Sequence, residues 1–449
     1  MYERCIFCCF CLLQKKSTIP FFLTALTDIY MLQRMTAQDW IAYRSKSMSS
    51  VFDQAEQIMQ NVASRGDEAL FEYTERFDGV SLDRLRVSDE IVQNALELVN
   101  DETIQALTDA YERIFKFHEL QKQKNLWLHE MEPGITLGVK TTPLERVGIY
   151  VPGGRAAYPS TVFMGAAPAR VAGVKEICVC TPTGQYGPSP LTLVACNLCG
   201  IKEIHQIGGA QAIAAMAYGT ESIQPVDRIV GPGNAYVAAA KQLVQKHVGI
   251  DFPAGPSELA IIADETAKPA FIAADIIAQS EHDPHASSVL ITPSEKQADL
   301  VEKELALQLE TVKRHEIVKE ALSHAGVIIT ADLLDAAEIS NTIAPEHLSL
   351  QVSDPFAILS LVKHAGSIFA GSYAPVACGD YASGTNHILP TSGYARQCSG
   401  LNVSHFTKTS TVQIINKEGL MQMHETIERI ADAEGLHAHA DSVRIRLRS

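Results

Sequence analysis

The sequence lacks an excess of basic charge and any apolar segment long enough to span a membrane. Its 37 lysines and arginines are outnumbered by 52 aspartates and glutamates, which gives a formal net charge of −15. This balance opposes binding to a phosphate backbone, so nucleic acid is not expected as a partner. The N-terminal apolar runs fall short of the roughly 18 to 20 residues that cross a bilayer. With 449 residues and 46% apolar content, the chain is long enough for two or more domains.

The first thirty-odd residues differ from the rest of the chain. No basic leader precedes their apolar run and no small-residue cleavage site follows it closely, so they make a poor signal peptide. They contain a cysteine cluster, but no second cluster completes a metal knuckle. We interpret residues 1–34 as a dispensable leader, with Met31 or Met35 as the working start. Four of the ten cysteines lie in it: Cys5, Cys8, Cys9 and Cys11.

The remaining cysteines are scattered, and Cys196 and Cys199 form a C-x-x-C pair. The pair falls late in SPLTLVACNLCG, which predicts a helix preceded by Ser189, started by Pro190 and ended by Gly200. Redox pairs lie instead at a helix start, where the helix dipole lowers the pKa of the thiol. We therefore expect buried, unreactive cysteines in a reducing compartment.

The hydrophobic pattern beyond residue 35 predicts helices first and then mixed structure. Residues 39–124 have the spacing of amphipathic helices, which indicates a helical N-terminal shoulder. Between residues 146 and 264, short β-rich runs alternate with helical ones, and a second such set begins near residue 287. This alternation is typical of parallel sheets with crossover helices. We therefore expect an α/β protein with two such units.

Glycines gather in the loops after three of the predicted strands, in VGIYVPGG, HQIGGAQ and RIVGPGN, and the last loop leads into a helix near Asn234. Open α/β sheets bind ligands at the carboxyl ends of their strands, where a helix N-terminus favours a pyrophosphate. Tight strand-to-helix turns explain the same glycines without any ligand, and no G-x-G-x-x-G motif is present. From the residues alone, both interpretations stay open.

Two stretches present polar side chains at points suited to a ligand. In IDFPAGPSE, prolines stiffen a loop that presents Ser257 just before a strand. In AQSEHDP, Gln279 and His282 are three residues apart near a helix end that Pro284 terminates, so they share a face. This spacing suits metal ligands, although a histidine near a helix end is also a favourable partner of the helix dipole.

Further polar residues occur near the C-terminus. NTIAPEHL places Glu346 directly beside His347, and Asp380 lies in ACGDYASGTNHILPT, a loop of small residues. The terminal stretch predicts a helix ending at Gly435, followed by an extended piece that alternates apolar residues with arginines. Two histidines could share one face of that extended piece, which suits a metal or a hydrated tail. The residues concerned are Val443, Ile445 and Leu447 for the alternation, and His437 and His439 for the pair.

Together, eight motifs in one order identify the chain as similar to histidinol dehydrogenases over roughly residues 35 to 449. The motifs are VGIYVPGG, GGAQAIAA, GPGNAYV, IDFPAGPSE, AQSEHDP, NTIAPEHL, ACGDYASGTNHILPT and AEGLHAH. The resemblance implies a cytoplasmic homodimer that oxidises L-histidinol to L-histidine through the aldehyde with NAD and one Zn²⁺ per subunit, late in histidine biosynthesis. It also implies two Rossmann-like domains, residues 35–148 with 259–391 and residues 149–258, and a tail domain at 392–449 that reaches into the partner subunit.

The resemblance implies a role for each matching residue. His347 would be the general base for the substrate hydroxyl, and Glu346 would activate the water that hydrates the aldehyde. An imidazole with an ordinary pKa near 6.5 is largely free to accept a proton at neutral pH, which agrees with the first role. The metal ligands would be Gln279, His282, Asp380 and His439. These four would also contact the substrate, together with Ser257, His347 and Glu434, and NAD would lie on Tyr150, Gln211 and Asn234.

Two other classes of enzyme use similar residues. A zinc hydrolase with Glu346 as general base would need the same metal ligands but would not reduce NAD. A thiolate-dependent aldehyde dehydrogenase would need an activated cysteine, yet Cys378 and Cys398 lie in loops without an evident base.

Overall fold

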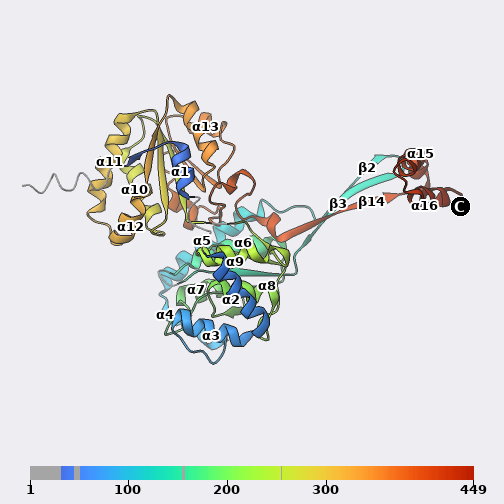
Figure 1. Ribbon diagram of the computed structural model, residues 1–449, viewed down its shortest axis with the longest axis horizontal. Helices are drawn as coiled ribbons and strands as arrows, with labels where there is room; N and C mark the ends of the chain where they lie inside the picture. Colours follow the sequence, from blue (N-terminus) through green and yellow to red (C-terminus); the bar gives the residue numbers. More distant parts are fainter. Residues whose placement is uncertain (1–31, 45–50, 154–156, 254, 449) are drawn as a thin grey trace, which may run out of the picture.

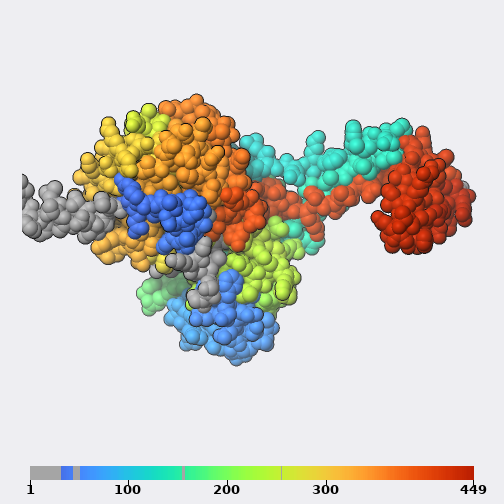
Figure 2. All heavy atoms as spheres, turned by 45° about the horizontal axis from the view of Figure 1, so that its top comes forward, coloured from blue at the N-terminus to red at the C-terminus, as the bar shows by residue number. Residues whose placement is uncertain are grey.

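The computed structural model describes residues 32–44, 51–153, 157–253 and 255–448. Two parallel sheets with their helices form the body, and a long arm carries the C-terminal helices away from it (Figure 1, Figure 2). The N-terminal cysteine cluster lies outside the described residues. The predicted C-terminal bound of the leader, residue 34, is wrong. Leu32 is buried, and β1 (Gln33–Arg34) pairs with β11 of the six-stranded sheet.

The six-stranded sheet has the order β1-β11-β10-β9-β12-β13, and all its strand pairs are parallel. Its central strands are buried on both faces, as their continuous apolar runs predict. One face packs against α10, α11 and α12, and the other against α1, α13 and α14. We call this unit the six-stranded lobe. Its further strands are β9 (Glu258–Ala263), β10 (Ser287–Thr292), β11 (Gly326–Ile329), β12 (His347–Gln351) and β13 (Ser367–Ala370). Its helices are α1 (Ala37–Arg44), α10 (Pro269–Ser280), α11 (Glu295–Leu309), α12 (His315–Leu322), α13 (Leu333–Ile343) and α14 (Pro355–Leu359).

The five-stranded sheet has the order β6-β5-β4-β7-β8 and is also parallel. The chain runs from β4 outward to β6 and then returns to β7 on the other side of β4, so the strand order reverses between β4 and β7. Its strands are β4 (Arg146–Tyr150), β5 (Glu176–Cys180), β6 (Glu203–His205), β7 (Arg228–Val230) and β8 (Gly249–Ile250). The crossover helices are α6 (Pro159–Ala172), α7 (Pro190–Leu198), α8 (Gly209–Tyr218) and α9 (Ala235–Leu243), followed by η2 (Val244–Lys246).

The N-terminal helices cover this second sheet. They are α2 (Phe52–Arg65), α3 (Asp67–Asp78), α4 (Asp89–Leu98) and α5 (Asp101–Glu119). The first two pack with α8 and α9 on one face, and α4 and α5 pack with α6 and α7 on the other. We call the whole unit the five-stranded lobe. The packing differs from the predicted division, in which residues 35–148 join residues 259–391. Among the described helices and strands of 35–148, α1 alone packs on the six-stranded sheet.

The arm is an antiparallel sheet of order β14-β3-β2 with two helices at its tip (Figure 1). It combines β2 (Leu126–Glu132) and β3 (Ile135–Pro143) with β14 (Thr407–Ile415), so it is not made by the C-terminal residues alone. The helices are α15 (Lys417–Ala433) and α16 (His437–Arg448). The extended terminal piece predicted from Val443, Ile445 and Leu447 is therefore helical. α16 packs against α15, where Arg444 binds Glu428 and Asp432, and these tertiary contacts override the alternating pattern.

Short helical turns lie between the six-stranded lobe and the arm: η3 (Cys378–Ala382), a π-helical turn, and the 3₁₀ turns η4 (Tyr394–Arg396) and η5 (Val403–Phe406).

The predicted burial of Cys196 and Cys199 at the end of α7 is confirmed, and all six cysteines of the described residues are free. None of the helices in the described part of the chain combines the length and the apolar character that a membrane crossing requires.

Candidate active site

Glu346 and His347 lie where α13 turns into β12. The helix ends at Ile343, and Ala344 adopts a left-handed conformation with φ of 52° before Pro345. Adjacent residues of a regular strand point to opposite faces, but this turn lets both side chains converge. The backbone N–H of Glu258, at the start of β9, donates to Glu346 Oε2 at 2.8 Å. The carbonyl oxygen of Glu258 accepts a hydrogen bond from His347 Nδ1 at 3.1 Å.

This contact defines the protonation state of His347. A carbonyl oxygen only accepts hydrogen bonds, so Nδ1 carries the proton and Nε2 carries the lone pair. His347 Nε2 is buried and has no hydrogen-bond partner. Burial lowers the pKa of His347 to about 3, and the nearby His282 and His387 add to the effect. The imidazole is therefore neutral at pH 7 and has an unoccupied basic nitrogen.

Glu346 is the complementary acid–base group. Its Oε2 lies 3.5 Å from His347 Nδ1, and its side chain is almost fully buried. Burial raises the pKa of Glu346 well above its ordinary value, and the carboxylates of Glu258 and Asp380 raise it further. A carboxylate with a raised pKa is a stronger proton acceptor, which suits a group that activates water.

Gln279, His282 and Asp380 supply donors of the kind that bind Zn²⁺. Gln279 lies in the last turn of α10, and the N–H of His282 donates to its carbonyl at 3.3 Å, which closes a turn that places the two residues together. Neither polar atom of the buried Gln279 side chain has a hydrogen-bond partner. His282 Nε2 lies 3.8 Å from Asp380 Oδ2, which belongs to the π-helical turn η3.

The electrostatics of this group favour a cation. Burial raises the pKa of Asp380 to about 7 and lowers the pKa of His282, so each is destabilised in its charged form. The C-terminal end of α10 also directs the negative end of its dipole at the group. A bound divalent cation would satisfy the two orphaned atoms of Gln279 only in part, because the amide oxygen is its sole ligand atom. The residues present thus fit a zinc ion with mixed nitrogen and oxygen ligands.

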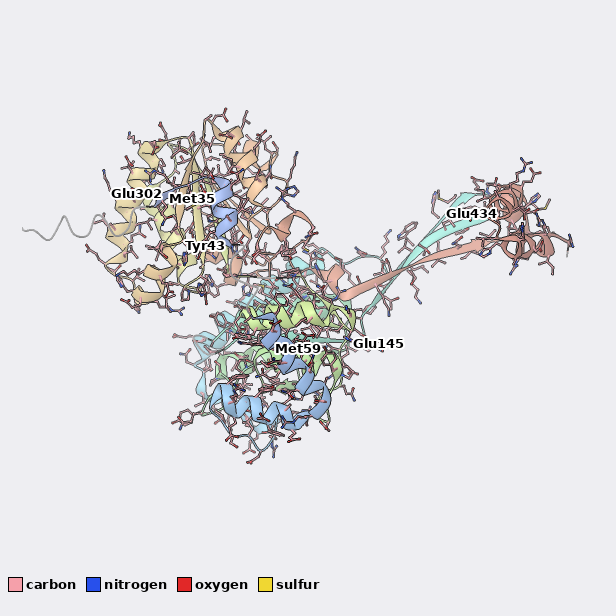
Figure 3. All side chains as sticks on the ribbon, viewed as in Figure 1. Met35, Tyr43, Met59, Glu145, Glu302 and Glu434 are labelled. Carbon is pink, nitrogen blue, oxygen red and sulfur yellow. The ribbon has the colours of Figure 1, made fainter. Side chains whose placement is uncertain are left out.

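Glu434 and His439 lie elsewhere, at the tip of the arm. Glu434 follows the last residue of α15, and His439 is in the first turn of α16. Figure 3 shows Glu434 at the far end of the arm, away from both lobes. A single chain therefore brings Gln279, His282 and Asp380 together but leaves these two predicted residues apart from them. Ser257 is nearer, directly before Glu258, and its carbonyl accepts from Ser287 at 3.1 Å.

A cavity of about 1330 Å³ lies at the carboxyl ends of the strands of the five-stranded lobe. All three residues predicted to bind NAD line it: Tyr150, Gln211 and Asn234. It covers the point between β4 and β7 where the strand order reverses, which is where open α/β sheets bind ligands. Gln211 is 2% exposed, and its Oε1 has no hydrogen-bond partner. Asn234 caps α9 by accepting from Tyr236 and Val237, as the predicted helix start requires.

Sequence reasoning missed His387. Its Nδ1 donates to the carbonyl of Asp380 at 3.0 Å, and burial lowers its pKa to about 4. The charge of a protonated His387 would lower the pKa of His347 further. The signal was available, because His387 belongs to the same ACGDYASGTNHILPT motif as Asp380. The loop lacks any periodic pattern, so the sequence around His387 does not indicate which way its side chain points.

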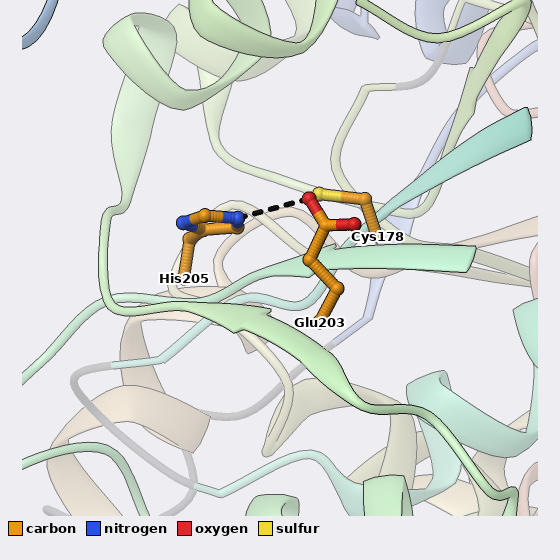
Figure 4. A group of neighbouring side chains, drawn as sticks. All are labelled: Cys178, Glu203 and His205. Atoms are coloured by element: carbon orange, nitrogen blue, oxygen red, sulfur yellow. Dashed lines mark hydrogen bonds and ion pairs between the residues drawn. The ribbon is translucent and has the colours of Figure 1, made fainter. Parts of the chain in front are cut away.

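A second group of possible metal ligands lies in the five-stranded lobe (Figure 4). The ligand atoms of Cys178, Glu203 and His205 are all within 4.8 Å of one another. However, Arg146 already binds Glu203 through two nitrogens at 2.6 and 2.8 Å. Burial opposes the charged form of His205, but hydrogen bonds with Cys178 and Glu203 raise its pKa to about 9. An imidazolium beside a guanidinium repels a cation, so we interpret this group as a buried ion-pair cluster.

Comparison with known proteins agrees with the motifs. The family model for histidinol dehydrogenase matches residues 42–447. The histidinol dehydrogenase of Methanosarcina mazei is 51% identical, over 90% of this chain and 93% of the relative. That of Listeria innocua is 49% identical, over 90% of this chain and 94% of the relative. A crystal structure of histidinol dehydrogenase from Elizabethkingia anophelis matches with a TM-score of 0.87 and 39% identity, covering 95% of this chain and 96% of that one.

The paired α/β lobes and the buried acid–base pair thus belong to an oxidoreductase, a dehydrogenase of an amino-acid biosynthetic route. The chain is a member of the histidinol dehydrogenase family.

The two metal-ligand groups make opposite predictions. His282→Asn should lower the zinc retained after dialysis, with about a tenfold or greater loss of affinity, because it removes a ligand. His205→Asn should retain zinc as the wild type does. Metal analysis of both folded variants decides between the groups, and the reverse pattern would move the metal to the Cys178 cluster.

Proposed function

We propose that the chain oxidises L-histidinol to L-histidine through the aldehyde, with two NAD and one zinc ion per subunit, in the last steps of histidine biosynthesis. The observation that carries the proposal is the bare, buried Nε2 of a neutral His347 beside Glu346 and three metal-type donors. This arrangement suits proton removal from a hydroxyl in a site sheltered from water. Membership of the family supports the same chemistry.

His347 and Glu346 divide the proton transfers between them. Nε2 of His347 accepts the proton of the substrate hydroxyl while the carbinol carbon gives its hydride to NAD⁺, which forms the aldehyde and one NADH. Glu346 then takes a proton from the water that adds to the aldehyde. The anionic hydrate gives a second hydride to a second NAD⁺, and the carboxylic acid that forms releases its remaining proton to solvent. The product is the carboxylate. Nε2 of His347 is the proton acceptor in the first step, and the Glu346 carboxylate is the acceptor in the second.

The other residues hold the reactants. Gln279, His282 and Asp380 bind the zinc ion, which when bound orients and polarises the substrate. Ser257 lies beside the Glu258 peptide and binds a polar end of the substrate. NAD occupies the cavity lined by Tyr150, Gln211 and Asn234, where the α8 N-terminus and the unpartnered Gln211 Oε1 offer polar contacts.

A homodimer completes the site. The arm carries Glu434 and His439 away from their own lobes, so a partner subunit is the place where they contribute to substrate and metal binding. The strand β2 of the arm is exposed along its whole length and presents large apolar side chains, as a surface that a second copy covers does. These side chains are Leu126, Trp127, Leu128 and Met131. We place the dimer in the cytoplasm.

Incubation of the protein with NAD⁺ and L-histidinol tests the proposal. We expect two NADH for each L-histidine formed. Zinc-dependent hydrolysis of amides or esters without NADH would instead indicate the hydrolase that uses Glu346 as base. Thiolate chemistry predicts that Cys378→Ser or Cys398→Ser abolishes activity, whereas we expect both to be active. Burial raises the pKa of the Cys398 thiol, which disfavours its thiolate.

Glu346→Gln should slow the second oxidation more than the first, because a neutral amide does not accept a proton from water. Pre-formed L-histidinal separates the two steps, since its oxidation starts with hydration. We expect a loss of about 10²-fold or more with the aldehyde as substrate, typical of a missing general base. Normal oxidation of the aldehyde together with failure on the alcohol would contradict the assigned role.

Mixed dimers test the exchange of the arm. His347→Ala and His439→Ala chains are each expected to be inactive, but a heterodimer of the two has one site with both wild-type residues. Activity should therefore return after the chains are unfolded together and refolded. If heterodimers are present and remain inactive, His439 serves the site of its own subunit.

A further inference from the structure

A buried histidine that the proposed chemistry does not use connects the five-stranded lobe to the loop that carries Asp380 and His387. His118 is fully buried at the C-terminal end of α5. Its Nδ1 lies 2.8 Å from Gln121 Oε1, and its Nε2 lies 3.3 Å from Asn386 Nδ2. Asn386, itself 7% exposed, is the residue immediately before His387.

Backbone groups fix the direction of every hydrogen bond in this chain of contacts. Asn386 Nδ2 donates to the carbonyl of Met164 at 2.8 Å, and its Oδ1 accepts from the N–H of Ile388 at 2.9 Å. The amide cannot be reversed without opposing like groups, so His118 Nε2 faces an N–H and must accept. Its Nδ1 then carries the proton and donates to Gln121 Oε1.

The other end of the chain of contacts is fixed as well. Gln121 Oε1 also accepts from the N–H of Val403, in the turn η5 that leads into β14. Burial lowers the pKa of His118, which agrees with a neutral ring that donates once and accepts once. His118 thus joins two hydrogen-bonded side chains: Gln121, which accepts from η5, and Asn386, which donates to α6.

The backbone of the same loop rests on α5. Gly384 has φ of 105°, and a Cβ built on it would lie 2.8 Å from the carbonyl oxygen of Arg113 in α5. The close approach leaves no room for a side chain, so the loop is seated on the helix next to the His118 contact. One residue of the site lies on each side of Gly384 in the sequence. Asp380 precedes it, and His387 follows it and donates a hydrogen bond to the Asp380 carbonyl.

We propose that His118 is a positioning residue: by accepting a hydrogen bond from Asn386, it holds Asp380 and His387 against the metal and substrate. This rests on the proposed function and adds to it. It makes α5, a helix of the five-stranded lobe, a support for groups that act on the six-stranded lobe. It also explains why the position needs a group that both donates and accepts, which an apolar residue of similar size does not supply.

Substitution at position 118 tests the role. His118→Leu should lower kcat/KM for L-histidinol by about tenfold or more and reduce zinc retention, while KM for NAD changes by less than about threefold. His118→Gln offers one acceptor and one donor on a side chain of comparable reach, so it should recover most of the lost activity. Gln121→Leu removes the hydrogen-bond acceptor of His118 Nδ1 at the half-exposed end of the series. It should lower kcat/KM and zinc retention in the same direction, but by less.

Ile114→Ala is the matched control, because Ile114 is fully buried in the same helix and lies outside the hydrogen-bond chain. It should lower Tm but leave kcat/KM and zinc retention near wild type. The proposal is overturned if folded His118→Leu equals wild type, if His118→Gln is no better than His118→Leu, or if Ile114→Ala loses as much activity. Should His118→Leu not fold, the Gln121→Leu and His118→Gln variants decide by the same criteria. Failure of the wild type to reduce NAD would instead reject the proposed function.

Discussion

The peptide unit at Glu258 is the contact on which the site depends. Its N–H binds one reactive side chain and its carbonyl binds the other, so the relative positions of Glu346 and His347 follow from the pairing of β9 with β12. A side-chain partner could rotate away, but a backbone group at the start of a central strand cannot. The six-stranded sheet therefore determines both the position of the base and which of its nitrogens is free.

The two lobes place their functional groups at opposite ends of their strands. In the six-stranded lobe the reactive groups lie at the amino ends of β9 and β12, near the C-terminal end of α10, where the helix dipole favours a cation. In the five-stranded lobe the large cavity lies at the carboxyl ends of the strands, where helix N-termini favour an anion. The fold thus offers separate places for a metal with its substrate and for a dinucleotide. The hydrogen bonds of His118 join α5 of the five-stranded lobe to the segment that carries Asp380 and His387.

Local signals in the sequence predicted much of this arrangement. The α/β alternation predicted two parallel sheets, and the Asn234 cap predicted the start of α9. Gln279 lies in the last turn of α10 as predicted, whereas His282 follows the C-cap of that helix. The association of α2 to α5 with the five-stranded lobe could not be read locally, because amphipathic helices do not specify which sheet they cover. The arm could not be predicted for a similar reason, since β14 pairs with β3, a strand more than two hundred residues earlier. The helix α16 packs against α15, a tertiary contact that the local pattern does not encode. His387 lies in a loop without periodicity, so its place near Asp380 follows only from the fold.

The protonation state of His347 is the most direct test of the central contact. Protein labelled with ¹⁵N at histidine allows each ring nitrogen to be observed by NMR, and comparison with His347→Gln assigns the signals. We expect Nδ1 of His347 to bear a proton, and Nε2 to bear none, throughout the neutral pH range in metal-free protein. A proton on Nε2, or an imidazolium at neutral pH, would contradict the claim that the Glu258 carbonyl and burial together keep Nε2 free to act as the base.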